Sequence, residues 1–372
     1  MQNLRALKNF TRAKLFGLPY FCHYYITKSC NLHCKKCSVP DNFRRLDVAK
    51  RGELSLDEVS VLASRLKSIG VFNVLLTGGE PFVRRDLSAI VRILVSEGFS
   101  VRIVTNGTNV VTRERLRETI EAGIDALQVS LDSLDPEMHD EMTGQEGTLE
   151  QVKRTIELAT EHLKGGMVIV LTVVSSMNIR ELPRISEYVT SQGAYSVFQP
   201  VHLAPDQNEA GVSGMPDCKE MLIGRKQNDL VDRVYGELIH MKRKGYNILS
   251  SKRFLMDSIE YFKTGKSRWN CDAYQYYLTI CPHGEVLPCV RFEDCEWLER
   301  MNVLDDGFVE KYQSKAMKEK AELFRKRCPG CVLACYREMS SLFGSPSVFW
   351  EMAVCHGKRS IRHILNRGGI PA

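Results

Sequence analysis

Residues 28–37 read KSCNLHCKKC and place three cysteines, Cys30, Cys34 and Cys37, in a C-x3-C-x2-C run. Three thiolates at this spacing can wrap around one metal cluster and leave one metal position without a protein ligand. Soft thiolates select iron–sulfur clusters, zinc or Cu(I), and structural zinc normally takes four protein ligands. The run therefore predicts an open metal site that a small molecule can complete. A zinc site or a few buried thiols is the alternative.

A second motif follows downstream, where the strand-like run 74–77 ends in Gly78, Gly79, Glu80 and Pro81. Glycine allows the backbone to approach a ligand closely, and a carboxylate such as that of Glu80 accepts hydrogen bonds from an ammonium group. An ordinary turn is the alternative for this motif on its own.

Taken together, the two motifs resemble those of the radical S-adenosylmethionine (SAM) enzymes. The resemblance implies that Cys30, Cys34 and Cys37 hold a four-iron, four-sulfur (4Fe-4S) cluster. The amino and carboxylate groups of SAM would then chelate the iron that has no protein ligand. It also implies that the methionine amino group of SAM is held by the second motif, Gly78, Gly79, Glu80 and Pro81.

The composition of the 372-residue chain is that of a globular protein with one large domain and a smaller one. Its hydrophobic content of 44% supports a substantial core, and its net charge of +6 is modest for this length. The chain has no long apolar run and no signal-peptide core, so we expect a cytoplasmic protein without a membrane span. Thirteen cysteines in such a chain favour metal ligation over disulfides. No basic cluster with interleaved aromatic residues indicates nucleic-acid binding.

Short apolar runs alternate with segments of helical periodicity from residue 21 onward. The predicted strands are Phe21–Thr27, Asn73–Thr77, Ser100–Thr105, Ala126–Leu131, Met167–Val174 and Tyr195–Val201. The predicted helices between them are Leu56–Ile69, Asp86–Glu97, Thr112–Ala122, Thr148–Lys164 and Ile179–Gln192. Repeated strand–helix units imply parallel strands with right-handed crossovers. The resemblance turns this α/β pattern into a partial (β/α)6 TIM-like barrel, whose ligands collect at the carboxyl ends of the strands.

Four regions are predicted along the chain. They are a basic N-terminal helix at 1–20, the radical SAM barrel at 21–225, a helical connector at 226–270 and a cysteine-rich domain at 271–372. We expect the N-terminal helix to pack on the domain that follows it. Its mixture of basic and apolar residues is also compatible with contact to a membrane surface.

Polar residues at the ends of further strands are candidates for contacts with SAM under this resemblance. They are Asn106, Ser130, Asp132 and Gln199. The alternatives are a simple turn for Asn106 and a helix N-cap for Asp132 or Asp135. Many relatives carry an aromatic residue just before the third cluster cysteine, packed near adenine, whereas this chain has Lys36. The adenine contact must then come from another residue or from the Lys36 stem.

Eight of the thirteen cysteines lie in residues 271–372, where their spacing resembles SPASM and twitch domains. Those domains bind one or two auxiliary 4Fe-4S clusters. The first half of the pattern matches, because Cys271 is followed by twelve residues, Gly284, four residues and Cys289. The second half departs, because three residues rather than five separate Cys331 from Cys335, and no cysteine lies three residues after Cys335.

Two ligand assignments follow from this spacing. In the first, a single auxiliary cluster is held by Cys271, Cys289, Cys328 and Cys331. In the second, which we favour, one cluster is held by Cys328, Cys331, Cys335 and Cys355. Cys271 and Cys289 then hold another cluster, helped by Cys281 or Cys295. A zinc knuckle over residues 328–355 is the alternative, and Cys22 and Cys218 are expected to be unliganded.

The resemblance implies an oxidoreductase-type or bond-forming enzyme that reductively cleaves SAM at a 4Fe-4S cluster. The resulting 5′-deoxyadenosyl radical abstracts hydrogen from the substrate. We expect this in the maturation of a peptide or protein. Oxidation or coupling of a small molecule, a tetrapyrrole or a lipid is the alternative, and a non-catalytic zinc or electron-transfer protein is the alternative from another class. The implied partners are SAM, the substrate peptide or small molecule, and a reductase, flavodoxin or ferredoxin that donates electrons.

Overall fold

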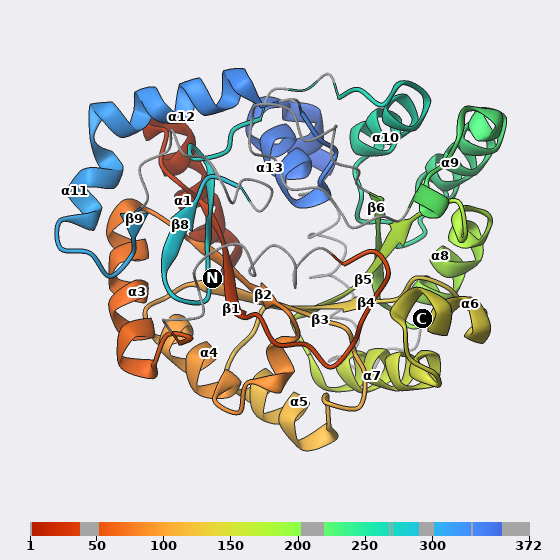
Figure 1. Cartoon of the computed structure of the whole chain (residues 1–372), viewed down its shortest axis with the longest axis horizontal. Helices are drawn as coiled ribbons and strands as arrows, with labels where there is room; N and C mark the ends of the chain where they lie inside the picture. Colours follow the sequence, from red (N-terminus) through yellow and green to blue (C-terminus); the bar gives the residue numbers. More distant parts are fainter. Residues whose placement is uncertain are drawn as a thin grey trace.

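The structure is a computed structural model that describes residues 2–37, 52–201, 219–267, 269, 271–289, 301–328 and 330–351. One sheet organises them, with strand order β6-β5-β4-β3-β2-β1-β7-β8-β9 (Figure 1). The first six strands are β1 Phe21–Thr27, β2 Asn73–Gly78, β3 Ser100–Thr105, β4 Ala126–Ser130, β5 Met167–Val174 and β6 Tyr195–Pro200. Each pairs in parallel with its neighbour in sequence. The predicted partial (β/α)6 barrel is therefore confirmed.

Five helices follow strands of the barrel and cover its outer side (Figure 1). They are α3 Leu56–Ile69, α4 Leu87–Ser96, α5 Arg113–Glu121, α7 Thr148–His162 and α8 Leu182–Ser191. Local signals set their ends. In α3, Ser55 and Glu58 form a capping box, and Gly70 ends the helix in the left-handed conformation with φ of 105°. The predicted helix at 179–192 begins instead as a 3-10 turn, Ile179–Glu181, because Pro183 cannot donate the amide hydrogen bond of a helix interior.

Three more helices lie between β4 and β7 in the chain. α9 Asn228–Arg243 and α10 Lys252–Thr264 lie within residues 226–270, for which a helical connector is predicted, whereas α6 Pro136–Thr143 was not predicted. The amide of Met138 donates to the Asp135 carboxylate over 2.9 Å, so Asp135 is the N-cap of α6. This confirms the capping alternative for Asp135.

The two faces of the sheet differ in burial. One face carries fully buried apolar residues such as Val74, Leu76 and Ile103, which belong to the core shared with the outer helices. Ten of the residues on the other face keep partial exposure to solvent. They are Tyr25, Leu75, Thr77, Arg102, Val104, Gln128, Ser130, Leu171, Val173 and Val197. Side chains of paired residues in adjacent strands share a face, so these residues line one accessible barrel interior.

The C-terminal region extends the same sheet. β7 Tyr277–Ile280 pairs in parallel with β1, and β8 Glu285–Leu287 and β9 Met301–Asn302 follow as antiparallel strands. The helices α11 Phe308–Gln313, α12 Lys315–Arg327 and α13 Ala334–Gly344 complete the described part of this region. The pairing of β7 with β1 therefore joins this region directly to the edge of the barrel sheet.

The N-terminal helix α1, Gln2–Phe16, packs against both the barrel and the C-terminal region. Phe10 stacks on Phe343 of α13 with ring centroids 4.6 Å apart, and its ring meets that of Tyr20 edge-on. Leu15 and Phe16 at the end of this helix remain exposed. Among the described helices, none combines the length and the apolar character needed to cross a bilayer.

Candidate functional site

The three cysteines of the C-x3-C-x2-C run lie in the segment that directly follows β1, and all three are half-buried. Burial raises the pKa of Cys34 to about 11, and the nearby thiols of Cys30 and Cys37 act in the same direction. Two N–H groups face Cys30: the backbone amide of Leu32 lies 3.4 Å from its Sγ, and the Asn106 side-chain amide lies 3.8 Å away. The fold therefore brings the predicted thiols together at the carboxyl end of the sheet.

Gly78 and Gly79 hold this cysteine loop against β2. A Cβ at Gly78 would lie 2.2 Å from the carbonyl oxygen of Thr27, and one at Gly79 would lie 2.1 Å from that of Ser29. The Gly79 amide donates to Thr27 O over 2.9 Å, and the Glu80 amide donates to Ser29 O over 2.8 Å. The glycines thus permit a close approach, as predicted, but the group that approaches them in the structure is the backbone of the cysteine loop.

Glu80 is a buried carboxylate that joins the ends of β2 and β3. Its Oε1 accepts hydrogen bonds from the Phe82 amide (3.0 Å) and the Thr105 hydroxyl (2.8 Å). Its Oε2 accepts one from the Asn106 amide at 2.6 Å. Burial raises the pKa of Glu80 to about 7, and these donors oppose that rise. Since a carboxylate oxygen can accept two hydrogen bonds, Oε2 keeps one acceptor position for a further donor.

Asn106 orients the first cysteine. Its amide donates to the Asn31 side-chain oxygen over 2.9 Å, and its own oxygen accepts from the Thr108 hydroxyl over 2.7 Å. The Asn31 amide in turn donates to Thr108 Oγ1 over 2.9 Å. The side chain of Asn106 in this turn therefore helps to hold Asn31, the residue next to Cys30, in place. Its predicted contact with SAM stays a prediction.

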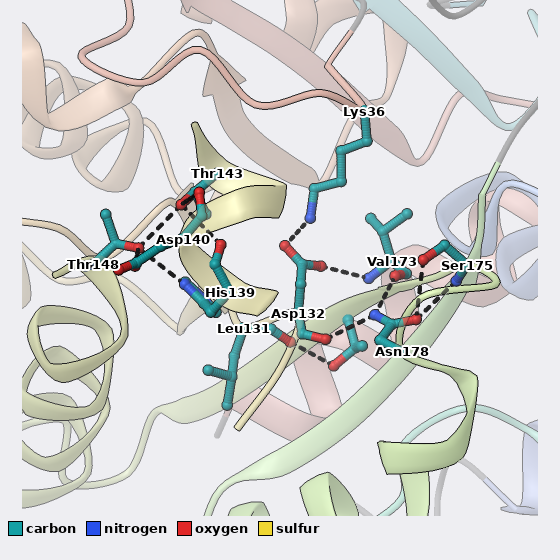
Figure 2. Close-up of polar contacts among 11 residues, drawn as sticks. Lys36, Leu131, Asp132, His139, Asp140, Thr143, Thr148, Val173, Ser175 and Asn178 are labelled. Carbon is teal, nitrogen blue, oxygen red and sulfur yellow. Dashed lines mark hydrogen bonds and ion pairs between the residues drawn. The ribbon is translucent and has the colours of Figure 1, made fainter. Parts of the chain in front are cut away.

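Lys36 and Asp132 form a buried ion pair across the mouth of the barrel (Figure 2). Their side chains are only 12% and 2% exposed. The other carboxylate oxygen of Asp132 accepts from the Val173 amide over 2.9 Å, and its backbone oxygen accepts from the Asn178 side chain over 2.7 Å. Asp132 thus ties the cysteine loop to the ends of β4 and β5. Sequence reasoning noted the unusual Lys36 but missed its partner, which lies 96 residues away.

The remaining predicted contacts are spread around the barrel mouth. Ser130 ends β4 on the accessible inner face, and Pro81 opens a buried 3-10 turn, Pro81–Val83. The Gln199 amide group is bound elsewhere, because it donates to the backbone oxygens of Pro200 and Val332 over 2.8 and 3.0 Å. Gln199 therefore joins β6 to the segment between Cys331 and Cys335, and its contact with SAM stays a prediction. His139 lies in α6, where its Nδ1 is 3.0 Å from the Thr148 hydroxyl (Figure 2).

Several of the C-terminal cysteines that the structure describes lie near one another and near α13. Burial raises the pKa of Cys271 to about 12, and the neighbouring thiols of Cys331 and Cys328 contribute to this rise. Burial likewise raises the pKa of Cys335 to about 12, with Cys271 as a neighbour. Cys289 and Cys335 both lie near the buried ring of Tyr336. The remaining predicted ligand on the described chain is Cys281, which is buried in the turn between β7 and β8.

The placement of Cys271 beside Cys328 and Cys331 is the arrangement that the single-cluster assignment requires. Cys295 and Cys355, on which the two-cluster assignment depends, lie outside the described residues, as does Cys218. Both assignments therefore stay predictions.

The cysteine loop after β1 and the C-terminal cysteines both fit iron–sulfur clusters, because their donor atoms are thiol sulfurs. Within the described ranges, no three His, Cys, Asp or Glu side chains converge closely enough to hold one metal ion. A cluster distributes its thiolates over separate irons, so its ligands need not converge on one point. The N–H groups that face Cys30 are also of the kind that stabilise a ligating thiolate.

Comparison with known proteins places these features in a family. The model of the Radical SAM superfamily matches residues 24–189, which include the cysteine loop and the barrel up to α8. A GTP 3′,8-cyclase of Aeromonas hydrophila subsp. hydrophila is 40% identical over 145 residues, which cover 38% of this chain and 41% of that protein. The antilisterial bacteriocin subtilosin biosynthesis protein AlbA of Bacillus subtilis is 26% identical over 321 residues, covering 84% of this chain and 64% of that protein. The chain spans about half the length of the first curated relatives that it matches.

A solved structure shares the fold beyond the matched domain. The crystal structure of Streptococcus suis SuiB bound to the precursor peptide SuiA has a TM-score of 0.62 at 15% identity. The alignment covers 86% of this chain and 70% of that one.

Proposed function

Since this chain is a member of the radical SAM superfamily, we propose that it binds SAM at the cysteine loop and modifies a peptide or protein that enters the barrel. Cys30, Cys34 and Cys37 would hold a 4Fe-4S cluster, which when bound would supply the electron for reductive cleavage of SAM and so the radical chemistry for removing a hydrogen atom from the substrate. The observation that carries the proposal is the way the motif Gly78–Pro81 clamps the cysteine loop over an accessible barrel interior.

The residues of the loop have separate roles in this proposal. Cys30, Cys34 and Cys37 ligate the cluster, and Asn106 with the Leu32 amide donates to the Cys30 thiolate. The free acceptor position on Glu80 Oε2 receives the methionine ammonium of SAM. A reductase, flavodoxin or ferredoxin is the proposed electron donor.

Glu80→Ala is expected to weaken SAM binding by about ten- to a hundredfold, because a hydrogen bond between a carboxylate and a cation contributes roughly 1.5–3 kcal/mol. The cysteines are unchanged, so the iron content should stay the same. Calorimetric titration of SAM into anaerobically reconstituted protein measures the affinity.

Thr105→Val is the matched control for Glu80, because it removes one hydrogen bond to the carboxylate and keeps the carboxylate itself. We expect near wild-type SAM affinity in this variant. An equal loss of affinity in Thr105→Val and Glu80→Ala would show that Glu80 acts only by holding β3.

The barrel interior favours a neutral substrate group. The partly exposed inner side chains are hydroxyl or amide groups, as in Thr77, Gln128 and Ser130, or aliphatic groups, as in Leu75. Arg102 is the one cation among the inward-facing residues of strands β1–β6 that the structure describes. A triphosphate needs several Arg or Lys groups to balance its charge, whereas a peptide side chain does not. The lining therefore supports peptide maturation over nucleotide chemistry.

A small-molecule substrate is the second candidate, because the relative with 40% identity is a GTP 3′,8-cyclase. This similarity covers 38% of the chain, so it bears on SAM chemistry more than on the substrate. Consumption of GTP by the reconstituted protein in the presence of SAM and reductant would favour this candidate over the first.

The test of the proposed chemistry is the formation of 5′-deoxyadenosine. We expect anaerobically reconstituted protein, mixed with SAM and dithionite, to release 5′-deoxyadenosine and methionine in equal amounts, measured by liquid chromatography. A protein that carries its full iron complement and binds SAM without any release would contradict the proposal.

A further inference from the structure

Tyr277 contacts a predicted auxiliary-cluster ligand directly. Its hydroxyl lies 2.8 Å from the Sγ of Cys271, and its side chain is fully buried on the first residue of β7. A hydroxyl at this distance forms a hydrogen bond with sulfur. A thiolate has no proton to donate, so Tyr277 must be the donor whenever Cys271 ligates a metal.

The local backbone is shaped to make this contact. The chain folds back between Cys271 and Tyr277 in a turn in which the Tyr274 amide donates to the Tyr277 carbonyl over 2.8 Å. Tyr274 sits in this turn with φ of 67°, the one non-glycine residue with positive φ in the described chain. The left-handed region is unfavourable for an aromatic residue, because its Cβ crowds the following carbonyl oxygen. Such outliers persist where the surrounding structure enforces them, and they gather at functional sites.

The ring of Tyr277 is held in place from the other side by Tyr336. Their ring centroids are 4.4 Å apart, and the Tyr336 hydroxyl lies 2.9 Å from Thr279 Oγ1 on the same strand, β7. Tyr336 also contacts His23 of β1, with ring centroids 4.9 Å apart. The Tyr277 hydroxyl therefore has little freedom to leave Cys271, because packing fixes its ring and the turn fixes its backbone.

We propose that Tyr277 is a positioning residue for an auxiliary iron–sulfur cluster, whose Cys271 thiolate it orients and stabilises by donating a hydrogen bond. The inference rests on the auxiliary-cluster part of the predicted function. Hydrogen bonds to cluster sulfurs are among the factors that set reduction potentials. Because such a bond stabilises the more negative, reduced cluster, Tyr277 raises the reduction potential of the auxiliary site. Partners of this kind also contribute to metal affinity.

The test uses the full chain carrying the substitutions Cys30→Ala, Cys34→Ala and Cys37→Ala, so that the auxiliary iron is observed alone. In this background, Tyr277→Phe should load iron but lose it to a chelator about ten- to a hundredfold faster. Its reduction potential, measured by electron paramagnetic resonance during redox titration, should shift downward. Tyr312→Phe is the matched control, because it removes the hydrogen bond from Tyr312 to the Tyr274 carbonyl in the same turn without removing one to a cysteine.

The possible outcomes distinguish a failure of the proposed role of Tyr277 from a failure of the auxiliary-cluster prediction on which that role rests. Faster iron loss and a lower potential in Tyr277→Phe alone support the proposal. Equal iron loss and equal potential in Tyr277→Phe and its parent overturn the role of Tyr277 and leave the auxiliary cluster in place. Equal changes in both tyrosine variants show that the turn matters and not the bond to Cys271, which also overturns it. No iron in the triple-cysteine background overturns the auxiliary cluster and this inference together.

Discussion

Replacing Cys30, Cys34 and Cys37 together with alanine is expected to abolish the release of 5′-deoxyadenosine from SAM. The three thiols are the proposed ligands of the cluster that reduces SAM, and they lie in one loop fastened to β2 by backbone hydrogen bonds. Without them the electron has no path to the sulfonium group. The variant should also lose about four irons per chain, because each 4Fe-4S cluster contributes four. Chromatographic assay of 5′-deoxyadenosine and iron analysis of the same samples measure both effects.

Cys22→Ala is the matched control for this experiment. Cys22 lies on β1, the strand that precedes the cysteine loop, and is fully buried in the core. Its removal should leave both iron content and SAM cleavage near wild type. Cleavage at the wild-type rate in the triple variant would exclude these cysteines as the cluster site.

The iron counts also distinguish the auxiliary assignments. Two auxiliary clusters predict about twelve irons in the wild type and about eight in the triple variant. A single auxiliary cluster predicts about eight and about four. Zinc in the C-terminal region predicts about four irons and one zinc in the wild type.

Asp132→Asn is expected to lower the free energy of unfolding of the metal-free protein by about 3–5 kcal/mol, because it leaves the buried Lys36 ammonium without its partner. The asparagine still accepts the hydrogen bond from the Val173 amide, so the change isolates the charge. The segment with Cys34 and Cys37 should also be held less firmly, so iron loading should fall. Chemical denaturation of the metal-free protein measures the stability.

Two further variants make this result specific. Adding Lys36→Met to Asp132→Asn removes the unpaired charge and should recover most of the lost stability. Lys35→Met is the matched control, because Lys35 pairs with Glu141 at an exposed site, with side chains 40% and 55% exposed. Exposed pairs contribute about 0–1 kcal/mol. An Asp132→Asn variant as stable as Lys35→Met would mean that the pair with Lys36 does not hold the loop.

Sequence patterns predicted the elements whose signals are local. β1 and α3 were predicted at their observed bounds, because a short apolar run marks the strand and a capping box marks the start of the helix. The cluster motif was found for the same reason. Helix α10 lies within the predicted helical connector, and local signals set its ends as well, since Ser251 caps it and Gly265 ends it.

The sequence by itself determined the family resemblance, the barrel and the cysteines that belong to one loop, because these depend on spacing along the chain. Only the tertiary structure decided what Gly79, Lys36 and Tyr277 do. Gly79 meets Ser29, and Lys36 meets Asp132, across neighbouring or opposite strand ends. The grouping of Cys271 with Cys328 and Cys331 was likewise decided only by the tertiary structure. The register of the strands sets these contacts. A periodic pattern within a short segment cannot predict which distant side chain that register will bring close to it.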